Sequence, residues 1–155
     1  MDLFTPFDDF DRFDAAVTNA LTALQAHGGY APRLVRRGPL FARFDVELAN
    51  QVHVEVDLGV DWRAEEPTLF DVGPVLAIED AVANKVGALY SRGEIRDYLD
   101  VDQIRQSGRF SDEALLELVE GHDPGFERQR FARQLADSAR LDPRQVTQRH
   151  RQLLT

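Results

Sequence analysis

The chain of 155 residues contains no cysteine. A disulfide framework, a thiolate metal site and a cysteine nucleophile are therefore excluded, and the composition fits a reducing compartment. No apolar run approaches the roughly 18 residues that a transmembrane helix needs, and the first residues lack the basic start and apolar core of a secretion signal. We therefore expect a cytoplasmic protein with no membrane partner.

Several motifs of well-known sites are also missing from the sequence. There is no glycine loop of the Walker type and no Gly-x-Ser-x-Gly elbow. No two histidines have a metal-ligand spacing such as His-x-x-x-His, and we expect His27, His122 and His150 to be surface residues. The absence of these motifs leaves function to be sought in carboxylates and cations.

Positive charge is scarce, with 18 Lys and Arg against 27 Asp and Glu and a formal net charge of −9. Broad, charge-driven binding to nucleic acid is not expected, because neutralisation of phosphates by Lys and Arg dominates such affinity. A local basic patch could override the net charge. The residues that could form it are Arg33, Arg36, Arg37 and Arg43.

The hydrophobic fraction of 43% is near the globular norm, so a core of ordinary size is expected. The pattern predicts an α+β protein (an α/β mixed sheet) with a β-rich part over residues 1–77 and a helical part over 78–155. Residues 2–14 are expected to form a loop leading into a helix, and their phenylalanines to be core residues. The other predicted elements are a helix over 10–27, strands over 34–36, 40–48 and 52–58, an irregular connector over 59–73, and helices over 78–91, 94–106, 111–120, 125–138 and 143–154.

The polar face of the strand 52–58 is the first candidate site. His53, Glu55 and Asp57 alternate with apolar residues and lie about 7 Å apart at two-residue steps. Neighbouring carboxylates at this spacing could share a hard cation such as Mg²⁺. A strand with one solvated face explains the same pattern, and the strand alone favours that interpretation.

The second candidate is the junction between the helices 78–91 and 94–106. On an unbroken helix Arg92 and Arg96 would each lie within about 20° of Lys85, and Arg96 and Asp100 would form an i, i+4 pair. A basic strip of this kind suits phosphate oxygens. An ion-paired, solvated face is the alternative, and spacing alone favours it.

A distinctive series of residues runs through this junction. It consists of Ile78-Glu79-Asp80, then Lys85, Ala88-Leu89, and Arg92-Gly93-x-x-Arg96-Asp97-x-x-Asp100. Together with a preceding strand that reads Val-Glu-Val-Asp-Leu, it resembles the signature of the AbiEii/AbiGii-type nucleotidyltransferase family. That family belongs to the DNA polymerase β-like superfamily and includes toxins of bacterial toxin–antitoxin and phage-abortive systems. The resemblance covers residues 2 to about 106.

The resemblance implies a role for each matching residue. Asp2 would be the second acid of an Asp-x-Asp-x-Phe motif and Asp57 the third metal-binding carboxylate. Lys85 would contact nucleotide phosphates, with Arg92 and Arg96 beside it. Asp97 or Asp100 would be the acid of the last motif. In the mechanism so implied, Mg²⁺ ions held by three carboxylates align an acceptor hydroxyl with the α-phosphate of an NTP.

The chain begins at the first of these motifs, so the first acid and the glycine turn before it have no counterpart. Three expectations follow. In the first, the true protein starts upstream of Met1 and is a nucleotidyltransferase that transfers NMP from an NTP to an RNA or protein acceptor. Alternatively it is a catalytically incomplete remnant that binds a nucleotide or a protein such as a cognate antitoxin. A third expectation is a helical interaction module whose Lys-Arg strip is only solvated.

Overall fold

The computed structural model describes residues 2–6, 12–71, 73–138, 142 and 144–146, and it consists of two compact units. The N-terminal unit is Met1–Arg63 and the C-terminal unit is Ala64–Thr155. The architecture is α+β, as predicted. Each unit is described by itself.

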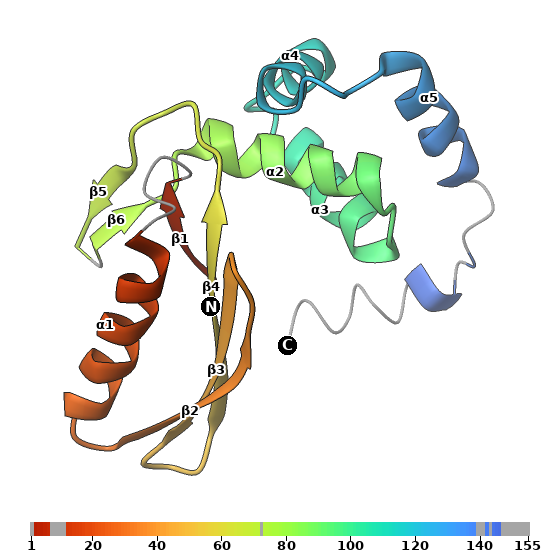
Figure 1. Cartoon of the computed structure of the whole chain (residues 1–155). Coiled ribbons are helices and arrows are strands. Elements are labelled where there is room, and N and C mark those ends of the chain that lie inside the picture. Colours follow the sequence, from red (N-terminus) through yellow and green to blue (C-terminus); the bar gives the residue numbers. More distant parts are fainter. Residues whose placement is uncertain (1, 7–11, 72, 139–141, 143, 147–155) are drawn as a thin grey trace. The chain divides into compact units, whose positions relative to one another are not determined.

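The N-terminal unit is a four-stranded mixed sheet with one helix on one face (Figure 1). The strands lie in the order β1-β4-β3-β2. The pair β1–β4 is parallel, and the pairs β4–β3 and β3–β2 are antiparallel. Their bounds are β1 (Asp2–Pro6), β2 (Tyr30–Arg37), β3 (Phe41–Leu48) and β4 (His53–Asp61), and the helix is α1 (Phe13–Ala26).

The strands β3 and β4 form the predicted hairpin. Ala42, Phe44 and Val46 of β3 are buried, and Phe44 pairs across the ladder with Val56 of β4. This apolar face packs against Phe13 and other residues of α1 in one core cluster. The two-residue period therefore correctly separated the core face from the polar face. The strand β2 is longer than the predicted strand 34–36.

The prediction of a loop at the start of the chain is wrong for residues 2–6. They form β1, which lies beside β4 with Phe4 opposite Gly59. The Phe4 ring lies against Gly59, because a Cβ added there would be in ordinary van der Waals contact with it at 3.6 Å. The partner of β1 is more than 50 residues away in the sequence, so no local period reports this strand.

The phenylalanine stripe is only partly core. Phe13 is buried, whereas Phe4 is 45% exposed. Phe7 and Phe10 lie outside the described residues. The helix predicted over 10–27 is confirmed as α1 from Phe13 onward.

The connector predicted over 59–73 also has regular structure. The strand β4 continues to Asp61 because Val60 and Asp61 pair with β1. In the C-terminal unit a small hairpin follows, formed by β5 (Thr68–Phe70) and β6 (Gly73–Val75). Strands of three residues are too short for a period to be recognised.

Four longer helices follow in the described part of the C-terminal unit: α2 (Ile78–Ser91), α3 (Ile95–Gln106), α4 (Asp112–His122) and α5 (Arg128–Asp137). Their existence was predicted from the 3.6-residue period, and α2 matches its prediction at both ends. The N-cap of α4 is Ser111, whose hydroxyl accepts a hydrogen bond from the Ala114 N–H at 3.1 Å. Of the helix predicted over 143–154, residues 144–146 are helical and Pro143 and 147–154 lie outside the described residues.

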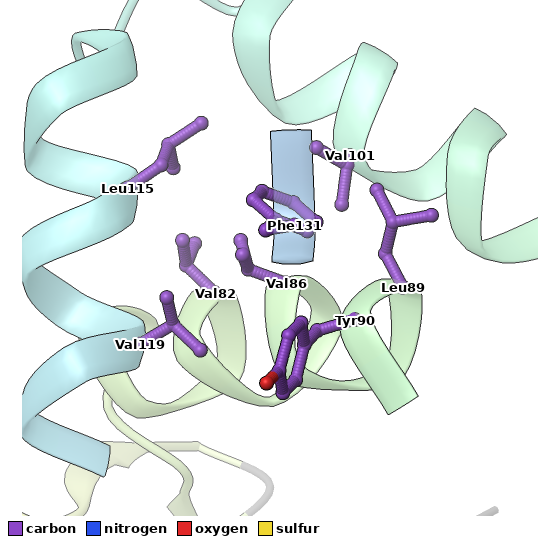
Figure 2. Close-up of a cluster of buried hydrophobic side chains, with 8 residues drawn as sticks. All are labelled: Val82, Val86, Leu89, Tyr90, Val101, Leu115, Val119 and Phe131. Atoms are coloured by element: carbon purple, nitrogen blue, oxygen red, sulfur yellow. The ribbon is translucent and has the colours of Figure 1, made fainter. Parts of the chain in front are cut away.

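A single core cluster holds these helices together. Figure 2 shows side chains from α2, α3, α4 and α5 converging. They are Val82, Val86, Leu89, Tyr90, Val101, Leu115, Val119 and Phe131. The four residues from α2 are spaced to share one helix face, which makes α2 the central helix of the unit.

Candidate functional site

Asp2 and Asp57 are neighbours in the N-terminal unit. They are direct partners in the parallel register of β1 and β4. Adjacent strands lie about 4.8 Å apart, so the two residues stand side by side on the sheet. The sheet therefore brings together the two acids that the resemblance assigns to metal.

Arg43 of β3 occupies the other side of Asp57. It is the antiparallel partner of Asp57, and its Nε and Nη2 donate to Oδ1 and Oδ2 at 2.7 and 2.6 Å. The hydrogen bond from Arg43 holds the pKa of Asp57 below its usual range. Arg43 also reaches a carboxylate oxygen of Glu55 at 3.2 Å. Sequence reasoning did not connect Arg43 with Asp57, although the hairpin register would have placed them opposite each other.

The donor set fits Mg²⁺ in kind but not in arrangement. Mg²⁺ prefers carboxylate oxygens and is held by one or two carboxylates plus substrate phosphates. Both oxygens of Asp57, however, already accept from Arg43. Within the described ranges, no three His, Asp or Glu side chains gather closely enough to hold a metal ion.

The rest of the polar sheet face is a network of ion pairs. His53 Nδ1 lies 3.0 Å from Asp45 Oδ1, and Arg33 lies 3.2 Å from the other oxygen of the same carboxylate. The hydrogen bonds from His53 and Arg33 lower the pKa of Asp45. The row His53, Glu55, Asp57 is thus partnered along β3, which agrees with the solvated-face interpretation of this strand.

Lys85 and Asp100 meet in the C-terminal unit. The Lys85 ammonium, on α2, donates to Asp100 Oδ2, on α3, at 2.7 Å. The side chains are 53% and 23% exposed, so the pair is open to solvent. Both line a groove of about 380 Å³. Its other lining residues are Ile78, Val82, Gln103, Ile104, Ser107, Arg109 and Phe110.

Asp97 has a different environment from Asp100. Its side chain is 1% exposed, and it accepts from Arg92 Nε and Nη2 at 3.0 and 2.7 Å. It also accepts from the Glu94 N–H at 3.0 Å, completing a capping box at the start of α3. Burial acts to raise the pKa of Asp97, but the bonds from Arg92 and Glu94 outweigh it and lower the pKa. This carboxylate secures the turn between α2 and α3.

The basic strip expected on an unbroken helix does not form. The helix α2 ends at Ser91, and Gly93 adopts a φ of +59° before α3 begins. Arg92 consequently turns onto Asp97, and Arg96 pairs with Glu94 at 3.0 Å instead of with Asp100. Only a residue without a side chain adopts a positive φ at low cost, so the glycine itself breaks the strip.

Two further residues had no predicted role of their own. Asp80, quoted above only within the series Ile78-Glu79-Asp80, is 2% exposed and accepts from the N–H groups of Ala64 and Glu65 at 2.9 and 3.1 Å. It anchors the segment that leads into the C-terminal unit. Arg109 lines the groove beside Lys85, and no motif had singled it out.

Two of the three histidines that were predicted to lie at the surface are among the described residues. His27 is exposed, as predicted, and stacks on Tyr30 with ring centroids 4.4 Å apart. His122 is half-buried, contrary to the surface prediction, and His150 lies outside the described residues. Among the helices that the structure describes, none has the length and apolar character needed to cross a membrane.

The described residues form an α+β protein with two neighbouring acids on its mixed sheet and an exposed lysine on α2. The family model described as nucleotidyl transferase AbiEii toxin, type IV toxin–antitoxin system, matches residues 1–154. The chain therefore belongs to this family, and membership implies a cognate antitoxin as its counterpart. No curated protein and no solved structure gives a significant match.

Proposed function

We propose that this protein binds a nucleoside triphosphate through Lys85 and transfers NMP to a hydroxyl of an RNA or protein acceptor. The exposed Lys85–Asp100 pair is the observation that carries the proposal. An ammonium in a solvent-open groove can exchange one carboxylate for phosphate oxygens at little cost, because an exposed ion pair contributes only about 0–1 kcal/mol to stability. The apolar residues lining the same groove offer a surface for the less polar part of a ligand.

The proposal assigns the last-motif acid to Asp100. Asp100 lines the groove and touches Lys85, so it can orient the ammonium. Asp97 is buried under Arg92 and has no free oxygen to offer. Arg92 and Arg96 stay predictions as phosphate ligands. Their side chains are 47% and 41% exposed, and Arg92 is paired with Asp97 and Arg96 with Glu94.

The proposal also assigns Asp2 and Asp57 to Mg²⁺, which would supply charge neutralisation at the reacting phosphate when bound. Their adjacency on β1 and β4 supports this assignment. The Arg43 fork on Asp57 opposes it. Mg²⁺ and a cytoplasmic location therefore stay predictions.

Titration calorimetry with ATP, GTP, CTP and UTP tests nucleotide binding. Wild type should bind at least one of them in the presence of Mg²⁺, and Lys85→Ala should weaken that binding at least about tenfold, as expected for loss of one charge-assisted contact. The free energy of unfolding should change by less than about 1 kcal/mol, because the pair is exposed. Absence of heat with every nucleotide would remove the nucleotide-binding proposal altogether.

A catalytically incomplete remnant is the second candidate. It is favoured by the engaged state of Asp57 and by the lack of a third metal-binding acid among the described residues. Transfer of radiolabelled NMP to tRNA or to the protein itself separates the two candidates. Binding without transfer supports the remnant, and transfer supports the enzyme.

A further inference from the structure

The groove that Lys85 lines runs along the helices α2 and α3. Lys85 Nζ and Asp100 Oδ2 meet across it at 2.7 Å. Ile78, at the beginning of α2, and Ser107, directly after the end of α3, line the same groove. Ile78 lies seven residues from Lys85, and Ser107 lies seven residues from Asp100, which is about 10 Å along a helix. The groove therefore extends from the Lys85–Asp100 pair to a second end about two helical turns away.

A second cation stands at that far end. Arg109 is exposed and lines the groove three residues after the end of α3. Its backbone N–H donates to Ser107 Oγ at 3.3 Å, and that hydroxyl donates to the Ile104 carbonyl at 2.6 Å, which fixes the turn. Among the residues that the structure describes, no carboxylate pairs with the Arg109 guanidinium, whereas Arg105 of α3 is forked onto Asp112. The donors of Arg109 are therefore open to a ligand.

The groove lining between and beside the two cations is mainly apolar. Val82 is buried, Ile104 and Phe110 are half-buried, and Phe110 packs against the core cluster of the unit, so the fold fixes this floor. An aromatic ring offers a surface on which a base can stack. Lysine and arginine suit phosphate oxygens. A cation, an apolar floor and a second cation in this order match a nucleoside with one phosphate on each side.

We propose that this groove binds a nucleotide that carries phosphate on both its 5′ and its 3′ oxygen, with Lys85 at the 5′-phosphate and Arg109 at the 3′-phosphate. The assignment of Lys85 rests on the proposed function. A free nucleoside 3′,5′-bisphosphate and an internal nucleotide of an RNA strand share this chemistry. The volume of the groove, about 380 Å³, lies within the range of small-molecule sites. An NTP has a free 3′-hydroxyl and leaves Arg109 without a phosphate.

Titration calorimetry with the 5′-monophosphate and the 3′,5′-bisphosphate of each of the four ribonucleosides tests the second contact. Wild type should bind at least one bisphosphate about tenfold more tightly than the matching monophosphate, the factor expected for one more charge-assisted contact. Arg109→Gln should bind both ligands equally, and Lys85→Ala should weaken both. Arg105→Gln is the matched control, because Arg105 belongs to α3 but lines a different cavity, and it should keep the tenfold preference.

A dinucleotide with a 5′-phosphate distinguishes the two sources of the ligand. If its affinity also exceeds that of the monophosphate and depends on Arg109, the groove accepts an RNA strand. If only the bisphosphate gains, the ligand is a free bisphosphate. Either result supports the proposal, because in both the phosphate on the 3′ oxygen is bound by Arg109.

Two results would overturn the proposal. One is a wild type that binds no bisphosphate more tightly than its monophosphate, a comparison that needs no variant to fold. The other is a preference that survives Arg109→Gln. NTP binding and NMP transfer are measured separately. Lys85-dependent NTP binding without the bisphosphate preference removes this inference and keeps the proposed function, whereas the preference without NMP transfer removes the enzyme and keeps the inference.

Discussion

Burial distinguishes three of the predicted site aspartates, each of which pairs with a cation. Asp97 is 1% exposed under the Arg92 fork, whereas Asp100 and Asp57 are 23% and 21% exposed beside Lys85 and Arg43. Breaking a buried pair leaves a charge with neither water nor partner, which is strongly destabilising. An exposed carboxylate loses a partner and regains water. Asp97 is thus suited to a stabilising role in the fold, whereas Asp100 and Asp57 can exchange their partners when a ligand binds.

Asp97→Asn is predicted to lower the free energy of unfolding by about 2 to 3 kcal/mol at pH 7, since Arg92 then faces a neutral amide. The folded pKa of Asp97 lies below its unfolded value of about 3.9. Its stabilising contribution is therefore complete above that unfolded pKa and is lost as pH falls through the folded pKa. Urea denaturation of wild type and variant between pH 7 and pH 2 should show the difference shrinking toward acid.

Asp112→Asn is the control for this prediction. Asp112 is forked by Arg105 in the same way, but its side chain is 70% exposed. The loss of stability at pH 7 should be much smaller than for Asp97→Asn. Equal losses in the two variants would show that burial does not decide the role of Asp97.

The turn between α2 and α3 decides which residues of the candidate site meet, because it interrupts the helix on which the basic strip was expected. Gly93 has a φ of +59°, and a Cβ added there would lie 1.8 Å from Gln134 Nε2 of α5. The turn is therefore constrained by its own backbone and by a neighbouring helix. Both constraints fall on a position that must lack a side chain.

Gly93→Ala is predicted to destabilise the protein by about 1 to 2 kcal/mol, from left-handed strain and displacement of Gln134. Gly108→Ala isolates the strain, because Gly108 has a φ of +67° and open space around it. Gly93→Ala/Gln134→Ala, compared with Gln134→Ala alone, should reduce the cost to that of Gly108→Ala. The measurement is thermal unfolding. If Gly93→Ala costs no more than Gly108→Ala, the contact with Gln134 is without consequence.

Elements stabilised by nearby residues were predictable, and those stabilised by distant residues were not. The helix α2 and the β3–β4 hairpin carry their period in the sequence, and Gly93 signals its own turn. The strand β1 needs β4 as its partner, which no local period contains. The site follows the same rule. Lys85 was found by resemblance, but its pairing with Asp100 depends on how α2 packs on α3.

The whole molecule has a net charge of −9, and its candidate basic patch is largely neutralised from within. Arg33 pairs with Asp45, Arg37 with Asp14 and Arg43 with Asp57. Arg36 lies over the Phe41 ring, 5.6 Å from its centre. An arginine that is already paired with a carboxylate neutralises little of the phosphate charge and so displaces few of the counterions around a nucleic acid. The sheet unit therefore offers little attraction for nucleic acid in general.

We accordingly predict weak binding with a shallow salt dependence to a mixed-sequence RNA, measured by fluorescence anisotropy of a labelled 20-mer. The Kd should exceed about 10 μM at 150 mM salt, within the range of non-specific binding, with a log–log salt slope of magnitude below about 2. Asp45→Asn frees Arg33 and should tighten binding and steepen the slope by about one contact. Submicromolar affinity with a steep slope in wild type would mean that cations outside this paired set form the interface. If binding is as weak as predicted, long-range electrostatic attraction does not select an RNA acceptor. The protein then has to recognise such an acceptor by its shape or by a few specific contacts.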